Sequence, residues 1–315
     1  MIRARWITLL LPVVISACAT HREALPAASP ATPPVAPGDF GVLVMAHGGS
    51  PEWNDEVLSA VEPLSAGHTI EVAFGMADPA TIQEAALRLE ALGVRRIGVV
   101  RLFISGESWY ERTEQILGLR GGAPSRPAPT GSGSDGGHGD HNHSMELWRA
   151  ETAASFALTT QGLAEAEAMG TVLADRARAL SRDPRTEDVL ILAHGPGDDS
   201  ENERWIATID ARAEAVRQSL PFRRVQVVTL REDWPEKRPE AERRIRAYVE
   251  RARAEGGAAI VIPFRVQGFG PYAQVLDGLE YVSDGHGLMP HPGVTRWIEG
   301  QIMALRRGPF RSPID

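Results

Sequence analysis

The chain contains the same strand-and-turn segment twice. VLVMAHGGSPEWN begins at Val42 and VLILAHGPGDDSEN begins at Val189. Each segment is an apolar run that ends in Ala-His-Gly, with an asparagine a few positions later. Such a run predicts a strand covered on both faces, as in a parallel sheet. Ligands bind at the carboxyl ends of these strands, so His47 and His194 are predicted at a functional edge, although a histidine there can also be a purely structural residue.

The alternation of strand-like and helix-like segments follows this repeat. The expected strands are 42–46, 69–74 and 96–104 in the first half and 189–193, 225–230 and 258–264 in the second. Helical stretches separate them, which is typical of right-handed βαβ units. IGVVRLFISG also matches AAIVIPFRVQG, which aligns Gly106 with Gly268. We therefore predict an α/β fold of two similar domains, each a parallel sheet flanked by helices, related by internal duplication.

The first residues predict export. Arg3 and Arg5 precede a short apolar run that ends in Ile-Ser-Ala-Cys at Cys18, the only cysteine of the chain. The run is too short to span a bilayer but fits a signal peptide over residues 1–17. Cys18 is then a predicted lipidation site, and the Pro-rich residues 18–38 are a predicted tether that holds the protein to the periplasmic side of a membrane, expected to be the outer one. The alternative is an ordinary signal peptide cleaved nearby.

A second low-complexity segment divides the first half. Residues 121–144 are rich in Gly, Ser and Pro and predict a flexible insert. The expected domains are 39–120 plus 145–181, and 182–315. His-rich tracts bind metals, so three histidines of the insert are predicted ligands of a divalent ion, with a solvated segment as the alternative. They are His138, His141 and His143.

Composition and missing motifs exclude several functions. The formal net charge is −8 and Lys237 is the only lysine, which argues against a nucleic-acid partner. The sequence has no GxxxxGK[ST], GxSxG or HExxH motif. Alanine precedes both His-Gly pairs, where a histidine phosphatase would have arginine. The sequence therefore lacks the motifs of P-loop enzymes, serine hydrolases, zincins and histidine phosphatases.

The motifs that are present resemble one family. The two AHG strand ends, the stretch ADPATIQEAALRLEALGVRRIGVVRLFISG and the closing LMPHPGVTRWIE resemble the sirohydrochlorin cobaltochelatases, which are class II tetrapyrrole chelatases. These motifs span most of residues 40–305 in the right order. The resemblance implies a two-domain chelatase, a lyase with a sirohydrochlorin-like tetrapyrrole as partner and Co, Ni, Fe or Zn as the divalent metal.

The resemblance also implies which residues act. His47 and His194 match the family's first histidine, and imidazole can bind a late first-row metal or accept a proton. Glu107 is the nearest carboxylate beyond the strand that ends at Ile104, and is a candidate ligand or base. Four residues of the two loops are candidate binding positions for the ligand: Gly48, Asn54, Gly195 and Asn202.

The chain departs from the family at a second histidine, which the resemblance places shortly after the glycine matched by Gly106. Ser108 and Trp109 stand there instead, and the other half has Gly270, Pro271 and Tyr272. His286 is a candidate substitute ligand, whereas His291 is expected to shape the turn before the last helix. Two interpretations stay open: a lipid-anchored chelatase, and a non-catalytic periplasmic lipoprotein that binds metal or a tetrapyrrole.

Overall fold

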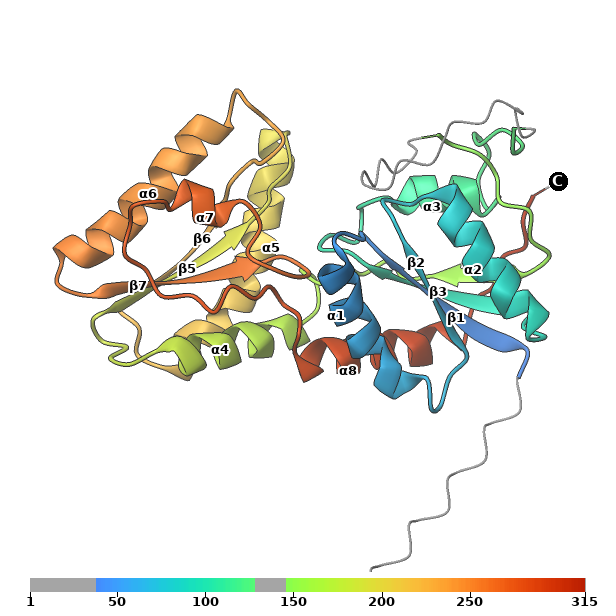
Figure 1. Ribbon diagram of the computed structural model, residues 1–315, viewed down its shortest axis with the longest axis horizontal. Helices are drawn as coiled ribbons and strands as arrows, with labels where there is room; N and C mark the ends of the chain where they lie inside the picture. The colour runs from blue at the N-terminus through green and yellow to red at the C-terminus, as the bar shows by residue number, and fades with distance from the viewer. Residues whose placement is uncertain (1–37, 128–145, 315) are drawn as a thin grey trace, which may run out of the picture. The chain divides into compact units, whose positions relative to one another are not determined.

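The computed structural model describes residues 38–127 and 146–314, which belong to one compact unit (Figure 1). The predicted signal peptide, Cys18, nearly all of the tether and the histidines of the insert lie outside the described residues. Among the described residues, no helix is both long enough and apolar enough to cross a bilayer.

The first half forms a four-stranded parallel sheet in the order β2-β1-β3-β4. Alternate residues of β1 point to opposite faces, so that Val42 and Val44 pack toward α1 and α8 while Leu43 and Met45 pack toward α2. The elements are β1 (Phe40–Ala46), α1 (Pro51–Val61), the 3₁₀ helix η1 (Glu62–Leu64), β2 (Ile70–Phe74), α2 (Pro79–Ala91), β3 (Arg96–Leu102), α3 (Tyr110–Ile116), β4 (Ser155–Leu158) and α4 (Ala168–Leu180).

The second half forms a three-stranded parallel sheet in the order β6-β5-β7. A single bridge between Ile260 and Val282 lies in the place that β4 takes in the first half. The elements are β5 (Glu187–Ala193), α5 (Asp199–Ser219), β6 (Arg224–Thr229), α6 (Arg238–Ala254), β7 (Ala258–Phe264), α7 (Tyr272–Val275) and α8 (Pro292–Leu305).

These two sheets confirm the predicted fold class. Both centre on an AHG strand, and the registers match, because Ala46 pairs with Leu102 on β3 just as Ala193 pairs with Phe264 on β7. The last paired residue before each histidine is therefore the same in the two halves. His47 and His194 leave their sheets at equivalent points.

The halves exchange one helix each. α4 comes from the first half but packs on α5 and β7, whereas α8, from the end of the chain, packs on α1 and β3. Figure 1 shows α8, in red, beside the blue α1, and the green α4 below β5 and β7. The chain beyond α8 continues in the first half, where Arg311 and Phe156 exchange two backbone hydrogen bonds of 2.8 Å. These contacts cross the domain boundary predicted at residue 181.

Side chains of the expected type start the helices. Ser50, followed by Pro51, accepts a hydrogen bond from the backbone N–H of Trp53 at the start of α1. At α8 the capping residue is His291, whose Nδ1 accepts from the N–H of Gly293 at 3.0 Å. His291 thus shapes the turn before the last helix, which agrees with the sequence prediction.

We expect His291 to make the protein less stable in acid. Burial lowers the pKa of His291, so the folded state holds the neutral ring more strongly than the unfolded chain does. As pH falls below about 6.5, the unfolded chain takes up the proton first and the free energy of unfolding decreases until the folded-state pKa is reached. His291→Asn keeps a capping acceptor but does not titrate.

Urea unfolding at about pH 7.5 and about pH 5.5 measures this effect. His291→Asn should lose less stability on acidification than the parent protein does. Some loss should persist, because burial and Arg306 also lower the pKa of His68. An unchanged loss in the variant would mean that His291 does not contribute to the pH dependence.

Candidate functional site

Both AHG histidines are held by the same local contact. His47 Nδ1 donates to the Gly48 carbonyl oxygen at 2.8 Å, and His194 Nδ1 donates to the Gly195 carbonyl oxygen at 2.8 Å. Each glycine has a φ of 78°, a conformation that other residues rarely adopt. A carbonyl oxygen only accepts, so the proton of the neutral ring lies on Nδ1. In both halves, this contact uses Nδ1 and leaves Nε2 for other partners.

The two asparagines support these loops. Asn54 Oδ1 accepts from the N–H of Gly49 at 3.0 Å. Asn202 is buried, and its Oδ1 accepts from the Thr229 hydroxyl at 2.7 Å. A Cβ added at Gly195 would lie 2.5 Å from Thr229 Cβ and 2.9 Å from Asn202 Oδ1, so this glycine fits closely over that pair. The asparagines and the AHG glycines position the histidines and do not themselves line the cavity described next.

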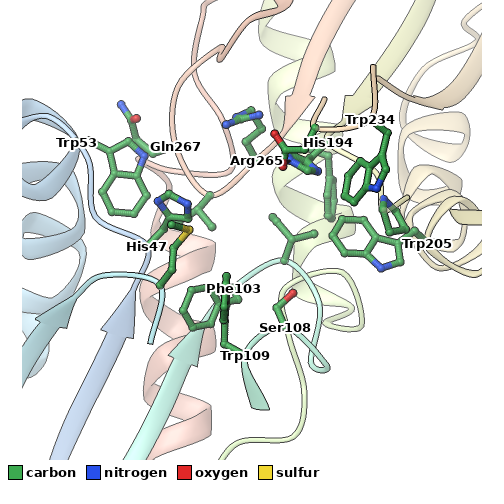
Figure 2. A pocket seen from close by; sticks show the side chains of 16 residues that line it. His47, Trp53, Phe103, Ser108, Trp109, His194, Trp205, Trp234, Arg265 and Gln267 are labelled. Atoms are coloured by element: carbon green, nitrogen blue, oxygen red, sulfur yellow. Dashed lines mark hydrogen bonds and ion pairs between the residues drawn. The ribbon is translucent and has the colours of Figure 1, made fainter. Parts of the chain in front are cut away.

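His47 and His194 line one cavity of about 500 Å³, together with residues that follow β3 and β7 (Figure 2). Its wall is mostly aromatic and aliphatic. Figure 2 shows His47 and Trp53 on one side of this space and His194, Trp205 and Trp234 on the other, with Trp109 below. The apolar lining residues are Trp53, Met76, Phe103, Ile104, Trp109, Pro196, Trp205, Trp234, Phe264 and Val266.

The histidines differ in their acidic neighbours. His194 Nε2 lies 3.0 Å from Asp233 Oδ2 and 4.0 Å from Glu232 Oε2, and its ring packs edge-on against Trp234. Both ring nitrogens of His194 thus face oxygen atoms that can accept hydrogen bonds. In the part of the chain that the structure describes, His47 Nε2 has no hydrogen-bond partner. The site combines the free Nε2 of His47 with a His194 ring whose two nitrogens both contact oxygen atoms.

Arg265 is the only cationic side chain among the described residues that line this cavity. Its Nη1 donates to Glu232 Oε1, and its guanidinium lies over the ring of Tyr272, 5.7 Å from the ring centroid. Tyr272 is fully buried. The carboxylate and the aromatic ring therefore fix Arg265 at the cavity wall.

A buried arginine shapes the loop after β3. Arg101 is 1% exposed and donates to the carbonyl oxygens of Gly106 (2.8 Å), Thr159 (2.9 Å) and Ser108. Burial lowers the pKa of Arg101 to about 10, which leaves it charged at neutral pH. The loop continues into Trp109, which has a left-handed φ of 58°. Arg101 thus fixes the backbone that places Ser108 and Trp109 at the cavity.

The structure does not bring the other predicted ligands to the histidines. Glu107 is exposed and lies outside the cavity lining, with its N–H bonded to the Ser105 hydroxyl at 3.2 Å. His286 is also exposed and outside the lining, and its N–H donates to Asp284 Oδ1. The predicted ligands of the insert and the lipidation site lie outside the described residues and stay predictions. Within the described ranges, no three His, Cys, Asp or Glu side chains form a group that would hold a metal ion.

Sequence reasoning missed the carboxylate that reaches a histidine. Asp233 follows β6, the strand that pairs with the His194 strand. The acidic pair Glu232–Asp233 after an apolar run was the available signal. Trp205 and Trp234 were also missed, because neither lies beside an AHG motif in the sequence.

Comparisons with known proteins identify the fold. Neither a protein-family model nor a curated protein matches the sequence. Structures of SirB from Bacillus subtilis with Fe³⁺ (13% identity, TM-score 0.54) and of the sirohydrochlorin chelatase SirB from Bacillus subtilis subspecies spizizenii with cobalt (12%, 0.53) are similar. Each matches 86% of this chain, which in turn covers 98% and 96% of those chains. The described chain therefore has a two-domain chelatase-like fold.

A larger protein is also similar. DR2241 from Deinococcus radiodurans, a multi-domain protein with structural similarity to chelatases and two additional domains, is 20% identical, with a TM-score of 0.50. The match covers 84% of this chain but only 54% of that protein. The chain thus spans about half the length of DR2241, and the similarity concerns the fold alone.

Proposed function

We propose that this chain binds a tetrapyrrole together with a divalent metal ion in the cavity lined by His47 and His194. The observation that carries the proposal is the convergence of both AHG histidines on one aromatic-walled cavity. Its volume of about 500 Å³ lies within the range of about 300 to 1,000 Å³ that is usual for small-molecule sites. Indole rings stack well on a flat, conjugated macrocycle.

The metal is a substrate or a bound partner of the macrocycle. Imidazole nitrogen suits Co²⁺, Ni²⁺, Fe²⁺ and Zn²⁺, and the similar SirB structures hold Fe³⁺ and cobalt. Insertion of a divalent ion releases the two inner N–H protons of the macrocycle as the metal–nitrogen bonds form. His47, with its free Nε2, is the proposed metal-binding residue. His194, beside Asp233, is the proposed acceptor of one of these protons, and the second leaves to water.

Binding without insertion is the second candidate. It is favoured by Ser108 and Trp109, which line the cavity where the family resemblance implies a further histidine. Neither a hydroxyl nor an indole replaces imidazole as a base near neutral pH. In this candidate, His47 is an axial ligand to a metal already held by the macrocycle, and the protein acts as a periplasmic carrier or store anchored at Cys18.

Spectroscopy with purified protein tests the proposal and separates the two candidates. Free-base sirohydrochlorin and free-base mesoporphyrin are each mixed with the protein, with and without Co²⁺. A shifted Soret band shows binding, and a collapse of the Q bands faster than in protein-free buffer shows insertion. We expect binding, and protein-dependent insertion under the first candidate only.

The insert requires a control of its own. A variant with His138→Ser, His141→Ser and His143→Ser removes the predicted ligands of that segment, so any metal effect that remains in it belongs elsewhere. If neither macrocycle binds with or without Co²⁺, the proposed function is wrong.

A further inference from the structure

The cavity wall offers little positive charge to an anionic ligand. Its one cation among the described residues, Arg265, is already paired with Glu232. Asp233 adds a carboxylate whose side chain is 72% exposed. The ionised side chains at this wall therefore sum to no net positive charge.

Three cations that lie within three residues of the lining in sequence are also engaged. Arg101 donates to three backbone carbonyl groups. Arg231 and Lys237 both pair with Asp199, at 2.9 Å and 2.5 Å. None of the three is among the lining residues. A ligand carboxylate would have to break an existing pair to gain one of these charges.

The rest of the wall penalises ionised groups. Four tryptophans, two phenylalanines and four aliphatic residues form most of it. A carboxylate pressed against such a surface loses hydration without gaining a partner. The chain's formal net charge of −8 adds a long-range repulsion. The loss of hydration and the repulsion both increase with every carboxylate on the ligand. The stacking of the macrocycle on the indoles does not increase with them.

From these charges, and resting on the proposed function, we infer that the site takes a tetrapyrrole with a largely apolar edge and few carboxylates, one of which shares the Arg265 guanidinium with Glu232. Dicarboxylate porphyrins have this chemistry. Sirohydrochlorin and uroporphyrin are octacarboxylates and do not. The inferred ligand therefore differs from the sirohydrochlorin-like macrocycle that the sequence resemblance implies.

A series of free-base porphyrins tests the inference. Mesoporphyrin, coproporphyrin and uroporphyrin share a macrocycle and carry increasing numbers of carboxylates. Four of the seven tryptophans of the chain line the cavity, so quenching of tryptophan fluorescence reports occupancy. We expect mesoporphyrin to bind at least about tenfold more tightly than uroporphyrin. Added salt should reduce this difference in affinity, because it screens the repulsion between uroporphyrin and the protein.

Arg265 is tested with a matched pair of ligands. Arg265→Gln should lower the affinity for mesoporphyrin several-fold. The affinity for mesoporphyrin dimethyl ester should not change, because the ester has no carboxylate to pair with Arg265. Equal effects on acid and ester would overturn the assignment of a carboxylate to Arg265.

Two tryptophan variants separate this inference from the proposed function. Trp205 is half-buried on α5, so Trp205→Ala should lower the affinity for mesoporphyrin and leave the fold intact. Trp297 lies outside the cavity, so Trp297→Phe should leave this affinity unchanged. If uroporphyrin binds as tightly as mesoporphyrin and Trp205→Ala weakens both, the inference is overturned and the proposed function stands. If Trp205→Ala changes the binding of no macrocycle, the proposed site itself is wrong.

Discussion

We expect His47→Ala to lower the affinity for zinc mesoporphyrin at least about tenfold and to leave the affinity for metal-free mesoporphyrin within about twofold. Zinc in a porphyrin accepts one axial ligand, and His47 Nε2 is a free imidazole nitrogen at the cavity. The metal-free macrocycle makes the same contacts with the indoles but no bond to His47. The difference between the two ligands therefore isolates the metal–nitrogen bond.

Two further variants complete this experiment. His194→Ala should cost less affinity for zinc mesoporphyrin, because Asp233 already engages its Nε2. His286→Ala changes an exposed histidine outside the cavity and should change nothing. An equal loss for both macrocycles in His47→Ala would show that the ring contacts the ligand without binding its metal. No loss for either would make the repeated AHG motif a structural feature only.

Arg101→Met should lower the free energy of unfolding by about 3 kcal/mol or more. Methionine retains much of the aliphatic bulk but leaves the carbonyl groups of Gly106, Ser108 and Thr159 without their donor. Each buried acceptor left unsatisfied costs about 1 to 3 kcal/mol. Chemical denaturation followed by circular dichroism measures the change.

The matched control is an arginine at the surface. The Arg253 side chain is 68% exposed and pairs with Glu280 alone among the described residues, so Arg253→Met should change stability by less than about 0.5 kcal/mol. The Arg101 variant should also bind mesoporphyrin more weakly, since the loop that carries Trp109 loses its support. A stability equal to that of Arg253→Met would contradict the role assigned to the buried guanidinium.

The strands could be predicted because their signal is local. Val42–Ala46 and 189–193 are continuous apolar runs, and the structure extends them by only two residues at their starts. β3 ends at Leu102 and not at Ile104, because the N–H of Phe103 turns back to the Arg101 carbonyl oxygen. β4 was missed: its four residues follow a loop and become a strand only by pairing with β3.

The site could be predicted only where its residues lie in the repeated motif. His47 and His194 stand at strand ends, and the topology brings both to one cavity. Asp233 and Trp205 reach that cavity from other segments of the chain. Their separation from the motif along the sequence does not reveal that they lie close to it in space. Glu107 shows the reverse case, because it is close to the β3 strand end in sequence but its side chain lies outside the cavity.

The helix exchange has a consequence for the ancestry and the dissection of this chain. Because α8 covers the first sheet and α4 packs on the second half, neither repeat encloses its own core. A single ancestral copy built this way would have needed a second copy to complete it, as in a domain-swapped homodimer. Fusion of two such copies would make a symmetric association permanent. Cutting the chain at residue 181 would thus yield two incomplete fragments that must recombine, and not two independent domains.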